Sequence, residues 1–136
     1  MELAVDRSGI PLGAATDAAC VHEVNLGPAA LADIPPVVDV PWGVPVLADR
    51  AYDSDPLRER LDLDGYRLLA RHRANRTKPP TNDGRRLRRL RRRWVVERTF
   101  AWVKAVRRVA TRYEVKCHLY DGFVSLACAF IALNRL

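Results

Sequence analysis

An α/β fold with a helical carboxy-terminal third is the fold class that this 136-residue sequence predicts. The main observation is the order of three segments, because residues 44–48 form a predicted strand, 56–61 a helix and 66–70 a second strand, which favours parallel pairing. A second observation is a helical pattern over residues 85–108. A chain of this length holds one modest core, so residues 1–136 are expected to form a single domain.

The amino-terminal residues predict a β-hairpin followed by a helix. The extended segments Glu2–Asp6 and Ile10–Ala15 flank a Gly-containing turn, in which Asp6 is most simply a turn residue. A helix is expected over His22–Ile34, disturbed at Gly27-Pro28.

The predicted helices after the hairpin have identifiable ends. Pro56 suits the first position of a helix, which Ser54 or Asp55 can cap. The last helix is expected from about Tyr120 to Asn134, and its apolar run is too short to span a bilayer. We therefore expect a core helix there, and no membrane as a partner.

Positive charge is concentrated in one stretch of the chain. The formal net charge is +7, yet residues 71–93 alone hold ten Arg, one Lys and one Asp, which sum to +10 and leave −3 for the rest. This stretch comprises a basic loop over Arg71–Gly84 and the start of the helix that follows. A single basic patch of this kind predicts a polyanion as partner, such as double-stranded DNA.

The cysteines and the first residues indicate the compartment. Three Cys without CxxC spacing do not suggest a disulfide framework. Met1-Glu2 opens without the basic and apolar regions of a signal peptide. Both observations predict a cytoplasmic protein.

Arg93, Glu97 and Lys104 share one face of the predicted helix, because their spacing of i, i+4 and i+11 spans about 16 Å along one side. On spacing alone, an ordinary surface ion pair worth a few tenths of a kcal/mol, plus a solvated lysine, explains them equally well. A neighbouring stripe that can pack on a core holds three apolar residues, Val96, Phe100 and Val103.

Asp49 directly follows the first predicted strand of the strand–helix–strand unit. A carboxylate at the carboxyl end of a parallel strand faces the crevice where α/β folds bind ligands. Asp53 and Asp55, by contrast, are read as ordinary loop and cap acids.

The region around Glu97 resembles bacterial insertion-sequence DDE transposases of the "four and five" groups. Their signature is Tyr, two residues, Arg, three residues, Glu, six residues and Lys. Arg93, Glu97 and Lys104 match this spacing, while Leu90 stands where the Tyr would be. Asp49 begins a segment similar to the family's second-Asp motif, which is Asp, any residue, Gly or Ala, then an aromatic.

The resemblance implies a site and a fold. By this match Asp49 and Glu97 are the second and third catalytic acids, which hold Mg²⁺ or Mn²⁺, and Arg93 and Lys104 contact DNA beside them. The family's first catalytic Asp lies on a strand that precedes the hairpin. We therefore expect an incomplete ribonuclease-H-like fold without its first strand, a partial DDE transposase catalytic domain over residues 1–136, in which the metal binds only when the first Asp is restored.

Two functions remain open. The first is DNA transposition by metal-dependent phosphodiester cleavage and strand transfer, with the chain as a truncated inactive copy or as one product of a split gene. Its partners would be the DNA ends of the element, and an upstream transposase fragment or a homo-oligomer. The alternative is a non-catalytic basic nucleic-acid-binding protein. In that alternative the stretch Arg71–Arg93 contacts phosphates and the acids are structural. The arginines expected to bind DNA within this stretch include Arg85, Arg86, Arg88 and Arg89.

Overall fold

The computed structural model describes residues 1–17 and 23–135. It divides into two compact units, of which unit 1 joins Met1–Val38 with Trp94–Leu136 and unit 2 is Asp39–Arg93. Each unit contains a two-stranded sheet of its own. Mixed α/β content with a helical carboxy-terminal part agrees with the predicted fold class, whereas a single domain over the whole chain stays a prediction.

Unit 1 begins with the predicted hairpin, in which β1 (Glu2–Val5) pairs antiparallel with β2 (Pro11–Ala15). One carboxylate oxygen of Asp6 accepts hydrogen bonds from the backbone N–H groups of Ser8 and Ile10, both at 2.8 Å. The predicted role of Asp6 as a turn residue is therefore confirmed. Gly9 completes the turn with a φ of +89°, a conformation that side chains disfavour.

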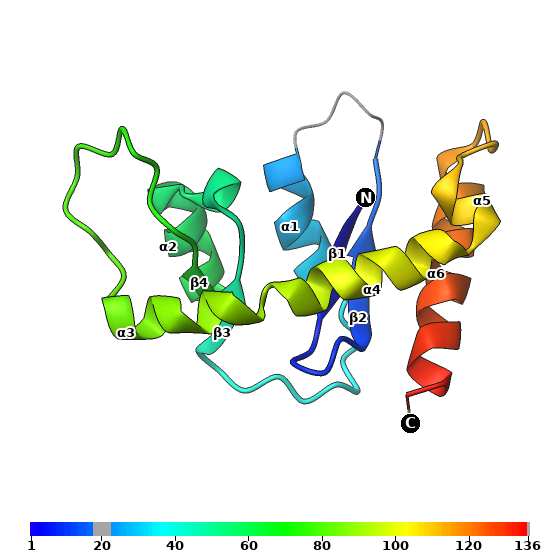
Figure 1. The fold of residues 1–136 in the computed structure, drawn as a ribbon, viewed down its shortest axis with the longest axis horizontal. Helices are drawn as coiled ribbons and strands as arrows, with labels where there is room; N and C mark the ends of the chain where they lie inside the picture. The colour runs from blue at the N-terminus through cyan, green and yellow to red at the C-terminus, as the bar shows by residue number, and fades with distance from the viewer. Residues whose placement is uncertain (18–22, 136) are drawn as a thin grey trace. The chain divides into compact units, whose positions relative to one another are not determined.

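Helix α1 (Glu23–Ala32) lies beside the hairpin, as Figure 1 shows. The predicted disturbance at Gly27-Pro28 is wrong, because the helix runs unbroken through Pro28. A proline ring normally clashes with the side chain of the preceding residue, and Gly27 has none. The predicted start at His22 lies outside the described residues.

The helical carboxy-terminal part consists of α4 (Trp94–Ala105), α5 (Arg107–Ala110) and α6 (Cys117–Leu133). Helix α6 is the predicted last helix and begins three residues before the expected Tyr120. Together with the hairpin, these helices enclose a cluster of buried side chains, namely Leu3, Val103, Val109, Val124 and Ala127. No helix among the described residues has the length and apolar character needed to cross a membrane.

The predicted continuous helix over residues 85–108 is divided. Helix α3 (Gly84–Leu87) passes into a 3₁₀ segment, η2 (Arg88–Arg92), before α4 begins. Arginines at i and i+4, such as Arg85 with Arg89, repel each other on an α-helix and weaken it. At the other end, the extended backbone of Val106 separates α4 from α5.

The buried stripe of α4 is centred one residue earlier than predicted. Val95, Thr99 and Val103 are its buried members, while Val96 and Phe100 are only half-buried. Thr99 enters the core because its hydroxyl finds an acceptor there, donating to the carbonyl of Gly9 at 2.8 Å. The helix thereby closes over the hairpin turn, and a Cβ on Gly9 would lie 2.9 Å from the Thr99 hydroxyl. Figure 1 shows α4 crossing the hairpin.

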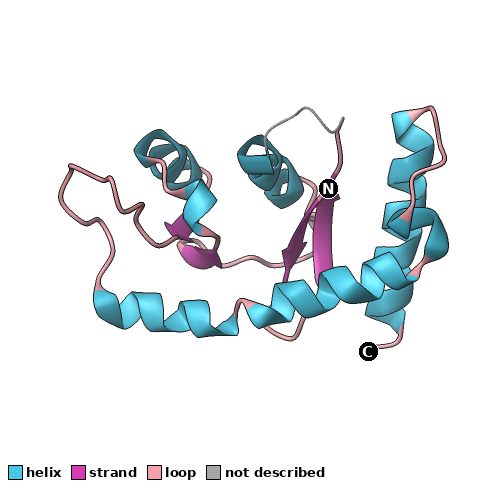
Figure 2. Cartoon of the chain, turned by 45° about the horizontal axis from the view of Figure 1, so that its top comes forward, coloured by secondary structure: helices cyan, strands magenta, loops and turns pink. Residues whose placement is uncertain are grey.

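Unit 2 contains the predicted strand–helix–strand sequence. Strand β3 (Val44–Leu47) pairs in parallel with β4 (Tyr66–Leu69), and α2 (Asp55–Leu63) connects them (Figure 2). A short 3₁₀ turn, η1 (Arg50–Tyr52), lies between β3 and α2. Strand β3 is half-exposed, because β4 is its one partner among the described residues. Residues 71–83 then form the predicted basic loop.

Replacing Thr99 by Val tests the contact between α4 and the hairpin turn. The change preserves shape but removes the donor to the buried Gly9 carbonyl, so the free energy of unfolding is expected to fall by about 1–2 kcal/mol. The measurement is the midpoint of urea unfolding at neutral pH. Thr111→Val at an exposed position is the matched control and should leave the midpoint unchanged. Equal stability of both variants and the parent chain would contradict this role of Thr99.

Candidate functional site

Asp49 stands where the sequence placed it, just beyond the carboxyl end of β3. Its side chain is 57% exposed and caps η1 by accepting a hydrogen bond from the backbone N–H of Arg50. The same oxygen, Oδ1, accepts from Nη1 of Arg93 at 3.1 Å. With 57% of the side chain exposed, the carboxylate is open to solvent.

Arg93 follows η2 as its C-cap residue in unit 2, immediately before α4. Its ion pair with Asp49 joins two residues that lie 44 positions apart, which the sequence spacing did not foresee. Both side chains are more than one-third exposed. A pair this exposed contributes about 0–1 kcal/mol, so a phosphate or a metal ion can compete for either partner at small cost.

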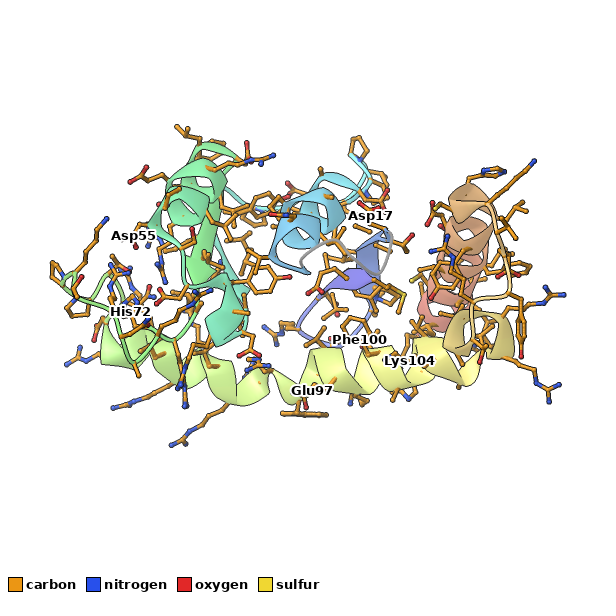
Figure 3. The ribbon with its side chains drawn as sticks, turned by 90° about the horizontal axis from the view of Figure 1, so that it is seen from above. Asp17, Asp55, His72, Glu97, Phe100 and Lys104 are labelled. Atoms are coloured by element: carbon orange, nitrogen blue, oxygen red, sulfur yellow. The ribbon has the colours of Figure 1, made fainter. Side chains whose placement is uncertain are left out.

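Glu97 and Lys104 lie on α4 in unit 1, and both are exposed. Seven residues separate them, which is close to two helical turns, so they share one side of the helix as predicted. The Lys104 ammonium also lies 5.9 Å from the centre of the Phe100 ring (Figure 3). Because Asp49 and Glu97 belong to different units, their convergence on one crevice stays a prediction.

Each of the two predicted metal-binding acids is of a kind that suits a hard divalent cation. Asp49 and Glu97 are exposed carboxylates, and Mg²⁺ prefers carboxylate oxygens together with water and phosphate oxygens. Two acids are fewer than the three that the resemblance implies. Among the described residues, no group of three His, Cys, Asp or Glu side chains gathers to hold a metal ion.

A stack of cations and rings on α4 was missed by sequence reasoning. The Arg98 guanidinium lies 4.7 Å from the ring centres of both Trp94 and Trp102, which precede and follow it by one turn. Arg98 also donates to the carbonyl of Ser8 at 2.7 Å, so it fastens the helix to the hairpin turn. The i, i+4, i+8 spacing of Trp, Arg and Trp was the available signal.

Asp53 is a buried hub of unit 2 rather than an ordinary loop acid. Its side chain is 3% exposed, and it accepts hydrogen bonds from Nη2 of Arg58 at 2.6 Å and from the backbone N–H of Arg73 at 2.7 Å. Nδ1 of His72 lies 2.9 Å from the same carboxylate. Burial raises the pKa of Asp53, but the hydrogen bonds from Arg73, Arg58 and His72 outweigh it and hold the pKa well below its ordinary range.

The ring of His72 has a defined protonation pattern. The backbone N–H of Thr81 donates to Nε2 at 3.1 Å, so that nitrogen carries no proton. Nδ1 must then carry the proton and donate it to Asp53. His72 therefore links the buried carboxylate to the far end of the basic loop.

Asp55 holds the middle of the same loop. Arg76 donates to both of its carboxylate oxygens, at 2.9 and 3.1 Å, and thereby lowers the pKa of Asp55. Two further cations pair with Asp55: Arg58 at 2.9 Å and Lys78 at 3.6 Å. Figure 3 labels Asp55 and His72 in this cluster. Several cations of the basic loop are thus neutralised internally.

The arginines of α3 and η2 differ from those of the loop. Leu90 is buried, whereas the arginines around it are exposed and make no ion pair with any described residue. The predicted phosphate-binding arginines are among them. The full set is Arg85, Arg86, Arg88, Arg89, Arg91 and Arg92.

Comparison with known proteins identifies the family. A family model described as "Transposase DDE domain" matches residues 1–130. The chain belongs to the DDE transposase family. The family inferred from the spacing of Arg93, Glu97 and Lys104 is thereby confirmed, while the assignment to the "four and five" groups stays a prediction.

Two curated relatives are similar over much of the chain. A putative transposase for insertion sequence element IS402 from Burkholderia cepacia is 34% identical over 140 residues, which cover 98% of this chain and 62% of the relative. A putative transposase for IS6501 from Brucella ovis is 37% identical over 91 residues, or 65% of this chain and 67% of the relative. The chain therefore spans 62% of the length of the IS402 protein. No solved structure matches it.

Asp53→Asn tests the buried hub of this DDE transposase chain. The amide keeps the shape but removes the closer of the two carboxylates that pair with the buried Arg58, so the free energy of unfolding is expected to fall by about 3 kcal/mol at pH 7. Folding lowers the pKa of Asp53, so its stabilisation is present above the unfolded pKa and is lost as the pH falls through the folded one. Below about pH 4 the difference between parent and variant should therefore narrow.

The measurement is urea unfolding at several pH values between about 2 and 7. Asp62→Asn, which changes an exposed acid of α2, is the matched control and should follow the parent chain. A Asp53→Asn variant as stable as the parent at pH 7 would disprove the role of Asp53 as a hub.

Proposed function

We propose that the chain acts in DNA transposition by metal-dependent phosphodiester cleavage and strand transfer, with Asp49 and Glu97 as two of the acids that hold the metal ions. The observation that carries the proposal is the position of Asp49. It combines an exposed carboxylate, the carboxyl end of a parallel strand and a paired arginine in one place. Membership of the DDE family and the exposed Glu97 on α4 support it.

Each residue has a chemical task in this proposal. When bound, Mg²⁺ or Mn²⁺ would supply activation of the nucleophile and stabilisation of the leaving oxygen. Asp49 and Glu97 supply the oxygen ligands, and Arg93 and Lys104 place positive charge beside the reacting phosphate. Arg93 can turn from Asp49 to a phosphate at small cost, because the exposed pair that it leaves is weak.

The third acid is proposed to come from outside these 136 residues. A strand that carries it could pair with the open edge of β1 or of β3, each of which has one partner among the described residues. That strand could belong to a longer polypeptide or to a separate upstream fragment. With two acids alone, at most one metal ion should bind, and weakly, so the isolated chain is proposed to be inactive.

A second candidate function is nucleic-acid binding without catalysis. The six exposed arginines of α3 and η2 favour this function, because they can bind the phosphate backbone of a nucleic acid without any catalytic group. The two proposals predict different effects of replacing the acids. Substitution of Asp49 or Glu97 should reduce transposition activity, but it should not weaken DNA binding by a non-catalytic protein.

Metal binding and cleavage test the first proposal. The purified chain should bind about one Mn²⁺ weakly in an electron paramagnetic resonance titration, and Asp49→Asn should reduce the binding. With Mg²⁺ or Mn²⁺, it should not cut duplex DNA that carries the terminal repeats flanking its gene. Cleavage should appear when an Asp-bearing upstream segment is fused or added, and Glu97→Gln should abolish it.

Asp62→Asn serves as the control acid, because it is exposed and lies outside the motifs. Efficient cleavage by the unaided chain, abolished by Asp49→Ala, would overturn the proposal that a third acid is supplied from outside. No effect of Asp49 or Glu97 on metal binding or cleavage would leave nucleic-acid binding as the function.

The dependence of DNA binding on salt tests the role of the exposed arginines. If about five of them neutralise phosphates, log K should fall against log salt concentration with a slope of about −4 to −5 on duplex DNA. Replacing Arg85, Arg86, Arg88 and Arg89 by Ala leaves one or two of these contacts, so the slope should fall to about −1 to −2 and binding to all sequences should weaken alike. A fluorescence anisotropy titration with a labelled duplex of arbitrary sequence measures both quantities.

A matched variant separates this patch from net charge alone. Four other exposed arginines, Arg7, Arg60, Arg67 and Arg107, are replaced together by Ala, which removes the same charge. This variant should keep most of the slope. Equal losses in the two variants would show that the patch is only part of a diffuse positive surface.

A further inference from the structure

Helix α6 leaves a large apolar stripe open on its outer side. Leu119, Leu126, Phe130 and Leu133 are 50%, 68%, 67% and 71% exposed. Their spacings of seven, four and three residues place all four on one side of the helix. The opposite side packs on the core of unit 1 through the buried Val124.

The charge and the shape of the stripe allow a second helix to pack against it. Asp121 is the one Asp, Glu, Lys or Arg within Cys117–Leu133, and it lies away from the stripe, where Thr16 donates a hydrogen bond to it. Gly122 lies on the stripe, and a Cβ added to it would meet no atom within 4 Å. The helix thus presents one small residue among large apolar ones.

The size of the stripe agrees with a weak but specific interface. At roughly 200 Å² for a large apolar side chain, the exposed fractions of the four residues correspond to about 500 Å² of apolar surface. Two such stripes together approach the roughly 1,000 Å² that distinguishes a specific interface from casual contact.

We propose that the α6 stripe binds the α6 stripe of a second copy of this chain, with the two helices antiparallel. A two-fold axis at Leu126 places Phe130 of each copy opposite Gly122 of the other, because both positions lie four residues from the axis. Leu119 and Leu133, seven residues from the axis, meet each other. Each copy therefore fits its large ring into the space above the partner's glycine, twice in one interface.

The antiparallel direction follows from the same residues. A parallel pair would set Phe130 against Phe130 and Gly122 against Gly122, which crowds one level and leaves a void at the other. Antiparallel helices also oppose their dipoles favourably. This surface lies apart from Asp49 and Glu97 in the sequence and does not depend on the proposed chemistry.

Sedimentation equilibrium of the full chain between about 1 and 100 µM tests the proposal. A monomer–dimer equilibrium is expected, and Leu126→Glu should weaken it by at least about tenfold, because two like charges then face each other on the axis. Leu63→Glu is the matched control, since Leu63 is 81% exposed on α2, and it should leave the equilibrium unchanged. A chain that is monomeric throughout, or a dimer that survives Leu126→Glu, would overturn the proposal.

A compensating pair tests the antiparallel register. Gly122→Leu should weaken the dimer by collision with the partner's Phe130, and Phe130→Ala should weaken it by lost contact. Combining them should restore much of the affinity, because the new leucine fills the space that the ring vacates. Circular dichroism confirms that each variant keeps its helix. Losses that simply add in the double variant would overturn the register.

Discussion

Unit 2 depends on the neutralisation of one buried carboxylate. An unpaired charge at Asp53 would be far costlier than the loss of any single apolar contact, so the chain must bring donors to it from elsewhere. It does so with Arg58 of α2 and with His72 and Arg73, which follow β4. The turn η1, the helix and the start of the basic loop are therefore fixed to one point.

The position of the candidate acid follows from that constraint. Asp49 caps η1 at its amino end, and Asp53 follows the same turn at its carboxyl end. A turn held by a buried hub keeps its capping carboxylate in a defined direction while leaving it exposed. Asp49 thus combines solvent access with a fixed backbone, which is what a metal-binding acid requires.

The basic segment over residues 71–93 has two parts, which differ in whether their arginines are paired within the fold. Arg73 and Arg76 bind Ala51, Asp53 and Asp55, so contacts within the fold offset the conformational entropy that these two side chains lose. The arginines of α3 and η2 have no such partners among the described residues, and their mutual repulsion persists until an external anion relieves it. Net charge therefore overstates the number of cations available to DNA, and the exposed group alone carries the electrostatic argument.

Local signals predicted most of the elements, and contacts over long sequence distances explain why several buried or paired side chains were missed. The Asp6 turn and the β3–α2–β4 order were readable from the sequence because each depends on neighbouring residues. The buried stripe of α4 was misplaced by one residue because a hydropathy pattern counts Thr99 as polar and therefore exposed. Its hydroxyl can be buried because it donates to the carbonyl of the distant Gly9. The Asp53 hub escaped prediction for the same reason, since its donors lie as many as 20 residues away. The pairing of Asp49 with Arg93 across 44 residues is a third example.

Two different kinds of surface in this chain remain available to partners. The outer edges of β1 and β3 offer backbone N–H and C=O groups, which only another strand can satisfy regularly. The outer face of α6 offers apolar side chains and no charge, which a second helix satisfies better than a strand does. The two kinds of partner use different groups of the chain. A strand from an upstream segment and a second copy of the chain can therefore bind at the same time. In the assembly proposed above, the strand would supply the proposed third acid, and the second copy would add another set of exposed arginines for a phosphate backbone.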